Sequence, residues 1–312
     1  MTPGTVSVII PHRDDADGLE RCLAALASLP DRPHEIIIAD NAATAGRPAI
    51  EPVCGRYADL PIRLVYEPRQ GAAHARNTAV NAAGGQLLAF LDCDCLPHPD
   101  WLQTGRAMLA IHAAVGGPVL VSWDVRDGPM TPAVAFDLLF GFDVARSFRR
   151  HHHLLTSNMW VRRDVFDAVG PFRPGLSEDV EWCHRAAAKG YELAFDPGLI
   201  VCHRALPSRR LLNDRWRRIT RETWLYGRER GESGFDWFAK CCAVAASIPV
   251  HGARLLFDSR LSGPRLRLGT FALLAEIRLR RAIYGLSLLF SSTAANSALA
   301  LRTAGQHDRK AR

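Results

Sequence analysis

The sequence lacks the features that mark extracellular and zinc-stabilised proteins. Its eight cysteines form no Cys-x-x-Cys pair and follow no regular spacing, so neither a zinc site nor a disulfide scaffold is indicated. The apolar residues 6–10 are too few for a secretory signal and have no basic leader before them. We therefore expect reduced cysteines and a cytoplasmic protein.

A charge-free apolar run of about 20 residues, which a membrane-spanning helix requires, is also missing. The two most apolar segments of the C-terminal part are residues 239–257 and 270–290. The first contains His251 and Arg254, and the second contains Glu276 and three arginines. Helices that lie in a membrane surface fit this composition better than helices that cross it.

Charge is distributed unevenly along the 312 residues, whose formal net charge is +7. Residues 1–203 carry 18 basic and 24 acidic side chains, whereas residues 204–312 carry 21 and 8. The 48% of apolar residues is enough for a sizeable core. We expect a catalytic domain at residues 1–205 and a basic helical region at residues 206–312, the latter with an anionic partner.

An unbroken apolar run at residues 87–91 ends in two carboxylates, Asp92 and Asp94. Apolar residues at both parities predict a strand that is buried on both faces of a parallel sheet. Ligands bind at the carboxyl ends of such strands. In extended chain both carboxylates lie on one side, where they suit Mg²⁺ or Mn²⁺ and, through the metal, a diphosphate. Two solvated loop aspartates are the alternative, and this motif alone does not decide.

Three more strands are predicted before this one, at residues 6–10, 35–39 and 62–66, with helices at residues 19–29 and 71–83. This alternation of strands and helices predicts right-handed crossovers and a mostly parallel α/β sheet flanked by helices. Asp40 and Asn41 follow the second strand, and Arg76 and Asn77 lie near the start of the second of these helices. Polar residues from several strand ends should therefore converge on one crevice.

The middle of the chain has weaker patterns. We expect a helix at residues 102–111, a strand at 118–122, a surface loop at the triple histidine 151–153, a short helix ending at Gly170, and strands at 191–195 and 199–202. Ser177 is expected to cap a helix whose first turn carries Glu178 and Asp179. These acids either complement the helix dipole or take part in chemistry. His203 follows the last strand, as a structural residue or a ligand.

Six segments in this order resemble the family 2 glycosyltransferases, which are inverting nucleotide-sugar enzymes with the GT-A fold. They are residues 6–11, 35–41, 71–77, 90–101, 158–163 and 178–185, within about the first 205 residues. The resemblance implies metal-dependent transfer of a sugar, with Mn²⁺ or Mg²⁺, from a nucleotide-sugar to a hydroxyl acceptor. UDP-sugars are the commonest donors, and cell-envelope or extracellular polysaccharides and glycolipids are the expected products.

The same resemblance implies roles for individual residues. Donor binding would involve Pro11, Arg13, Asp40, Asn41, Gly71, Arg76, Asn77 and Asp92. The metal would be held by Asp92, Asp94 and His203, and Trp182 and Asn158 would border the acceptor. Asp179 would be the catalytic base, with Glu178 as the reserve. Physically, an inverting displacement needs such a base on the face opposite the leaving diphosphate.

Two departures from the family pattern bear on function. Many members have an aromatic residue and Asn after the first strand, whereas this chain has His12-Arg13-Asp14, so stacking on the base would fall to Arg13. The Gln-x-x-Arg-Trp motif of processive synthases is missing, which favours addition of one sugar per encounter.

The basic C-terminal part begins with an amphipathic pattern at residues 209–225. We expect its helices to lie on the inner face of the cell membrane, with arginines toward anionic head groups, near a lipid-linked sugar acceptor. A helical subdomain packed on the catalytic domain is the alternative. Nucleic-acid binding is not expected, because no recognisable module accompanies the charge.

Three rival functions stay open on sequence alone. A nucleotidyltransferase usually has a Gly-rich, lysine-bearing loop after the first strand, which is missing here. A phosphatase that uses Asp-x-Asp as its nucleophile carries the motif after its first strand, not after about the fourth. A catalytically silent scaffold that binds a nucleotide or sugar at a membrane assembly is the third, because the residues after Pro11 depart from the family.

Overall fold

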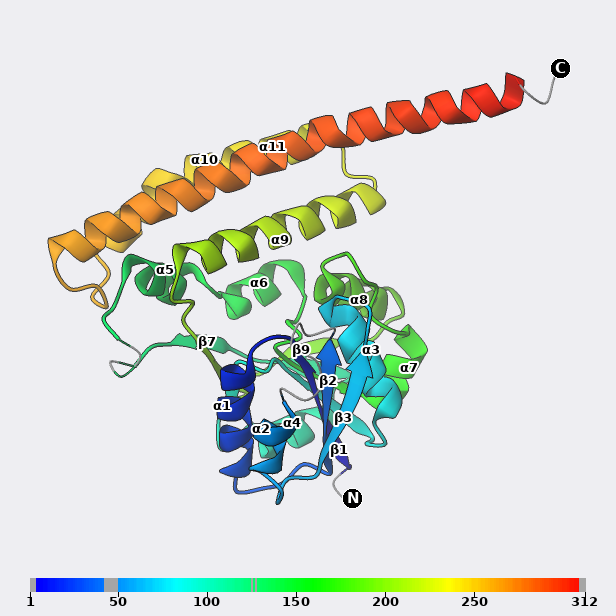
Figure 1. Ribbon diagram of the computed structural model, residues 1–312, viewed down its shortest axis with the longest axis vertical. Coiled ribbons are helices and arrows are strands. Elements are labelled where there is room, and N and C mark those ends of the chain that lie inside the picture. Colours follow the sequence, from blue (N-terminus) through cyan, green and yellow to red (C-terminus); the bar gives the residue numbers. More distant parts are fainter. Residues whose placement is uncertain (1–3, 42–49, 125, 127, 309–312) are drawn as a thin grey trace. The chain divides into compact units, whose positions relative to one another are not determined.

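The computed structural model describes residues 4–41, 50–124, 126 and 128–308 (Figure 1). The chain divides into two compact units. Unit 1 comprises Met1–Gly128 and Phe140–Ala205, and unit 2 comprises Pro129–Leu139 and Leu206–Arg312. The sequence pattern suggested contiguous domains and did not indicate that Pro129–Leu139 groups with the C-terminal helices.

Unit 1 is built on a seven-stranded sheet with the order β3-β2-β1-β4-β8-β6-β9. The predicted mostly parallel α/β sheet is confirmed: β3, β2, β1 and β4 run parallel, β8 is antiparallel to both of its neighbours, and β6 is parallel to β9. The antiparallel β8 was not predicted. The strands are β1 (Val6–His12), β2 (Glu35–Asn41), β3 (Ile62–Glu67), β4 (Leu87–Leu91), β6 (Ala114–Gly116), β8 (Asn158–Arg162) and β9 (Leu193–Phe195).

Helices cover both faces of this sheet, so alternate residues of one strand enter different cores. In β1, Val8 and Ile10 pack into one apolar cluster and Ile9 into the other. The first cluster includes residues of α1 (Ala16–Ala27), α2 (Glu51–Gly55) and α4 (Trp101–Leu109). The second includes residues of α3 (Ala72–Ala82), α7 (Arg163–Val169) and α8 (Glu178–Ala188). Burial on both faces explains why the strands are continuous apolar runs.

A second, three-stranded sheet has the order β5-β10-β7, comprising β5 (Cys95–Pro97), β10 (Val201–Arg204) and β7 (Val119–Ser122). Its register sets His203 opposite Cys95, next to Asp94. The predicted position of His203 after a strand at residues 199–202 was wrong, because the strand begins at Val201 and His203 lies inside it. Pairing with β5 rather than a strand end therefore brings this imidazole to Asp94.

The triple histidine was also partly mispredicted as a loop. His151 is the last residue of α6 (Val144–His151), and His152 adopts a left-handed conformation that ends the helix. Its φ of +50° is uncommon for a residue other than glycine.

Unit 2 consists of helices: α5 (Pro132–Phe140), α9 (Arg209–Glu229), α10 (Gly234–Leu256) and α11 (Pro264–Asp308). α10 begins at a capping box in which Ser233 and Asp236 satisfy each other's backbone N–H groups. The buried Asp137 of α5 pairs with Arg215 of α9 at 3.1 Å. Within the described part of the chain, no helix combines the length and hydropathy needed to cross a membrane.

Candidate active site

The guanidinium of Arg76 joins two carboxylates from distant parts of unit 1. Nη2 lies 2.6 Å from Oδ1 of Asp92, just after β4, and Nη1 lies 2.7 Å from Oε1 of Glu178, at the start of α8. Arg76 is only 4% exposed. Burial alone would lower the pKa of Arg76, but Asp92 and Glu178 raise it above its ordinary value. The site therefore contains a permanent positive charge that aligns both carboxylates.

Asp179 follows Glu178 in the first turn of α8 and is partly buried. The backbone N–H of Val180 donates to its Oδ1 at 2.8 Å. Removal from water, and then the nearby charge of Glu178, raises the pKa of Asp179 to about 7. A carboxyl group with this pKa is suited to proton transfer near neutral pH. Ser177 occupies the predicted N-cap position, although its side chain makes no capping hydrogen bond.

Asp94 lies beside His203, with Oδ2 3.0 Å from the imidazole Nε2. Asp94 is 32% exposed and His203 9%. The predicted set of three metal ligands is not assembled, because Asp92 turns toward the buried Arg76, which requires a counter-charge. Across the described ranges, no group of three His, Cys, Asp or Glu side chains is arranged to hold a metal ion. Of the three predicted ligands, Asp94 and His203 are in direct contact.

Asp40, at the end of β2, has a buried carboxylate 3.5 Å from Nδ1 of His12. In the part of the chain that the structure describes, neither carboxylate oxygen of Asp40 has a hydrogen-bond partner. Buried acceptors of this kind are costly unless a donor reaches them. Because Asp40 is only 1% exposed, a ligand with N–H or O–H groups would have to displace neighbouring residues to reach these two acceptors.

Three comparisons with known proteins agree. The model of "Glycosyl transferase family 2" matches residues 7–170. Glycosyltransferase AglE of Haloferax volcanii is 35% identical over 219 residues, which are 68% of this chain and 71% of that protein. The chain belongs to glycosyl transferase family 2. The predicted resemblance is thereby confirmed.

More distant similarities agree with the membership in family 2. The pre-mycofactocin glycosyltransferase of Mycobacterium tuberculosis is 26% identical over 64% of this chain, which spans only 42% of that relative. Among solved structures, the mannosyltransferase PcManGT of Pyrobaculum calidifontis, determined with GDP-Man and Mn²⁺, has a TM-score of 0.55 at 21% identity. The match covers 96% of this chain and 81% of PcManGT.

GalNAc-T7, determined with UDP, GalNAc and Mn²⁺, has a TM-score of 0.51 at 19% identity. That match covers 70% of this chain and 48% of GalNAc-T7. These structures confirm the predicted GT-A fold.

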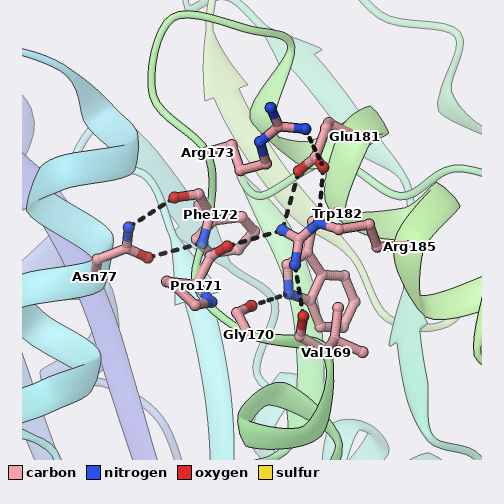
Figure 2. Close-up of polar contacts among 9 residues, drawn as sticks. All are labelled: Asn77, Val169, Gly170, Pro171, Phe172, Arg173, Glu181, Trp182 and Arg185. Atoms are coloured by element: carbon pink, nitrogen blue, oxygen red, sulfur yellow. Dashed lines mark hydrogen bonds and ion pairs between the residues drawn. The ribbon is translucent and has the colours of Figure 1, made fainter. Parts of the chain in front are cut away.

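Asn77 and Trp182 of this family 2 protein hold the segment that leads to α8 (Figure 2). The Asn77 amide donates to the Phe172 carbonyl at 2.8 Å and accepts from its N–H at 2.9 Å. The Trp182 Nε1–H donates to the Gly170 carbonyl at 3.0 Å. Both ends of the Asn77 amide are thus used inside the protein, and the residue positions the loop rather than contacting the nucleotide through that amide.

The two residues predicted to border the acceptor are fully buried. Trp182 is 0% exposed and packs against Phe166 and Phe172. Asn158 is 1% exposed, accepts from Nε1 of Trp101, and donates to the carbonyls of Pro118 and Leu199. Because their polar atoms all bond to protein, neither residue can touch an acceptor. Their role is structural, and this prediction was wrong.

Asn41 likewise organises a loop of the family 2 domain. Its amide donates to the carbonyls of Glu67 and Arg69 and accepts from the N–H of Gly71. Gly71 precedes α3 with a φ of +134°, which favours glycine. Asn41 therefore sets the conformation at the start of the helix that carries Arg76.

The two remaining predicted donor residues lie at the end of β1. Pro11 is in the strand, opposite Ala39 of β2. Arg13 follows the strand with an exposed side chain, 3.7 Å from the carboxylate of Asp14. Its exposure leaves the guanidinium plane accessible from solvent.

Glu67 was not predicted as a site residue. It ends β3, is 3% exposed, and accepts hydrogen bonds from Arg69 and Thr78. Those from Arg69 contribute most to lowering its pKa to about 2. The signal that indicated Asp40, an acidic residue at the carboxyl end of a parallel strand, also applies to Glu67.

Proposed function

We propose that this family 2 protein transfers a sugar from a nucleotide-sugar to an acceptor hydroxyl with inversion, and that Asp179 is the base. The observation that carries the proposal is Asp179 itself. The pKa of Asp179 is raised to about 7. Asp179 is also the neighbour of Glu178, and Arg76 forms ion pairs with both Glu178 and Asp92. A base beside the carboxylate motif of β4 is what an inverting displacement requires.

Each bond change in the proposed step has a group to receive it. The acceptor oxygen forms a bond to the anomeric carbon as the bond from that carbon to the diphosphate oxygen breaks. The acceptor proton passes to a carboxylate oxygen of Asp179, and the leaving group departs as the nucleoside diphosphate. Arg76 keeps Glu178 and Asp92 in place without taking part in the proton transfer.

The donor's nucleotide is proposed to bind at the end of β2. The Asp40 oxygens support this, because neither accepts a hydrogen bond from the described residues and nucleobases present N–H donors. PcManGT was determined with GDP-Man, and GalNAc-T7 with UDP and GalNAc, so both nucleotides occur in this fold. We propose a UDP-sugar as the donor, with a GDP-sugar as the alternative to be tested.

A divalent metal, Mn²⁺ or Mg²⁺, is proposed to bind at Asp94 and His203. The 3.0 Å between their ligand atoms fits, because adjacent ligands in octahedral coordination are about 3 Å apart. Carboxylate and imidazole ligands suit Mn²⁺, and diphosphate oxygens would add to them. When bound, the ion neutralises charge on the leaving diphosphate.

Nucleotide binding gives the direct test. The thermal unfolding midpoint of the purified protein is measured in the presence of UDP, GDP or dTDP, each with Mn²⁺ or with EDTA. A ligand at 100 times its dissociation constant adds about 2.7 kcal/mol, which should raise Tm by roughly 5–10 °C. We expect one nucleotide to stabilise only with metal, and Asp94→Ala/His203→Ala to lose this effect. His98→Ala is the matched control, because His98 pairs with Asp100 at 3.6 Å on the surface.

Transfer itself is tested by following nucleotide release and by assigning the anomeric configuration of the product with NMR. Retention of configuration would contradict the role of Asp179. If no nucleotide binds and no donor is hydrolysed, the non-catalytic scaffold becomes the better interpretation. We further propose that the acceptor is a sugar carried on a lipid, since residues 204–312 have 21 basic and 8 acidic side chains suited to an anionic membrane surface.

A further inference from the structure

α10 has two apolar faces. Its inward residues Trp237, Cys241 and Leu255 are buried. A second row recurs every three or four residues, or multiples of that interval, and is exposed along the whole helix. We name this row the outer stripe: Phe235, Phe238, Cys242, Ala246, Val250 and Phe257, which follows the last helical residue. Phe235, Val250 and Phe257 are 76%, 70% and 88% exposed. A soluble helix normally shows charged residues on such a face.

α11 carries a similar exposed row. Leu268, Leu279, Ile283 and Phe290 lie 11, 4 and 7 residues apart, which places them on one side of the helix, and all four are exposed. α10 and α11 run along each other, with α9 beside them (Figure 1). Within unit 2, therefore, two neighbouring helices both expose apolar side chains.

The packing of α9 shows where the outer stripe points. Trp224 of α9 contacts Trp237 of α10, with ring centroids 5.0 Å apart. Trp237 lies on the face of α10 opposite the outer stripe, as their helical spacing requires. The stripe is consequently turned away from α9, and its largest side chains are exposed among the described residues. The exposed face of α9 carries Arg210, Arg217, Arg218 and Arg221, together with the exposed Leu211 and Leu225.

Charge decides which occupant suits this surface. Lys240, Arg254 and Asp236 lie beside the outer stripe, and Arg280 lies beside the row of α11; all four are exposed. Lys240 pairs with Glu232 and Arg280 with Glu276. The excess of 21 basic over 8 acidic side chains in residues 204–312 would make two copies of unit 2 repel each other. An anionic lipid surface suits both the exposed apolar side chains and the positive charge. The apolar side chains would contact acyl chains, and the basic side chains would contact the head groups.

We propose that the outer stripe of α10 inserts into the interfacial layer of an anionic bilayer, with α10 lying in the membrane plane. The helix has 23 residues, so about 34 Å of apolar face would contact lipid. This inference rests on the proposed function in one respect: membrane binding would place unit 1 where a lipid-linked acceptor is found. Binding to lipid itself does not depend on catalysis.

The test is flotation of the full chain with vesicles of phosphatidylcholine, with or without about one quarter phosphatidylglycerol. Val250→Asp/Phe257→Asp puts two charges on the outer stripe at exposed positions, where folding should tolerate them. Ile111→Asp is the matched control, since Ile111 is 74% exposed in unit 1. We expect the wild type and the control to bind anionic vesicles, and the stripe variant to bind at least tenfold more weakly.

Three other outcomes of the vesicle test would overturn the proposal. If the wild type does not bind anionic vesicles, the outer stripe does not insert into a membrane. Equal binding by the stripe variant, lost at about 0.5 M salt, assigns binding to surface charge alone. A wild-type dimer that the stripe variant converts to a monomer, with vesicle binding unchanged, assigns the stripe to a second copy of the chain. Donor hydrolysis is measured in parallel. If the wild type binds vesicles but does not hydrolyse a donor, the proposed function is contradicted, whereas membrane binding by the outer stripe is still supported.

Discussion

Arg185 and Glu181 lie one turn apart on α8 and form a two-point ion pair, with Nε–Oε1 at 2.7 Å and Nη2–Oε2 at 2.9 Å (Figure 2). The same guanidinium donates to the carbonyls of Val169 and Pro171 at 2.6 and 2.7 Å. With Trp182 and Asn77, this arginine engages four consecutive carbonyls, at residues 169–172. α8 thus fixes the segment that precedes its own first turn, where Glu178 and Asp179 lie.

Replacing Arg185 should therefore reduce both stability and turnover. Arg185→Ala leaves the buried Glu181 with Arg173 at 3.4 Å and frees two carbonyls, so unfolding in urea should require about 3 kcal/mol less. We expect kcat to fall about tenfold with little change in donor affinity, because the donor residues are on other elements. Arg185→Lys should recover only part of the lost stability and turnover, since an ammonium group cannot form the two-point ion pair with Glu181. Arg173→Ala, a half-exposed partner of Glu181, is the control and should change stability by less than about 1 kcal/mol.

Arg76→Met should show how strongly its charge organises the site. The change leaves Asp92 and Glu178 without their shared counter-charge. Because Asp92 is one-third exposed, we expect a loss of about 2–4 kcal/mol, toward the lower end of the range for a broken buried pair. Arg210→Met, at a position that is 91% exposed, should leave urea unfolding unchanged. Equal stability of the two variants would mean that water readily replaces the Arg76 contacts.

Asp179→Asn should lower transfer by about 10²- to 10⁴-fold while nucleotide binding, followed by thermal shift, persists. The base must be ionised, so wild-type kcat/KM, which reports the free enzyme, should rise with pH through about 7, the pKa of Asp179. Glu178→Gln should keep a single ionisation in the profile at a reduced rate, but shift it to lower pH, because the charge of Glu178 helps to raise the pKa of Asp179. If Glu178→Gln abolishes the profile instead, Glu178 is the base.

Asp179 should also cost stability at alkaline pH. Its pKa is about 7 in the folded protein against an ordinary 3.8, so between these values the folded state holds a proton that the unfolded state has released. The free energy of unfolding therefore falls as pH rises from about 4 to 7. Asp179→Asn should remove this slope and gain about 1–2 kcal/mol near pH 8, after allowance for partial exposure. Urea titrations of both proteins across this pH range measure it, and a parallel dependence in the variant would contradict it.

EDTA should abolish turnover, and Mn²⁺ or Mg²⁺ should restore it. His203→Ala should raise the metal concentration needed for half-maximal activity by about 10- to 100-fold, because one proposed ligand is lost. His98→Ala should need no extra metal. Full activity of the wild type in EDTA would contradict the proposed metal dependence.

Local patterns predicted much of unit 1 correctly. Alternating burial of residues such as Ile9 and Ile10 requires a two-sided sheet, and that requirement is written in consecutive apolar residues. Acidic residues at the ends of parallel strands must reach one edge of the sheet, which is why Asp40 and Asp92 could be selected. The order of the motifs was enough to indicate the family.

Side-chain partners depend on contacts between distant segments, which no local pattern encodes. Arg76 meets residues 16 and 102 positions away, and His203 reaches Asp94 through the pairing of β10 with β5. Trp182 and Asn158 belong to recognisable motifs, yet packing buries them completely. The sequence by itself determined the fold class and the family, because periodicity and strand-end chemistry are local. Only the tertiary structure decided which polar groups are already bonded and which can meet a substrate, because that depends on non-local packing.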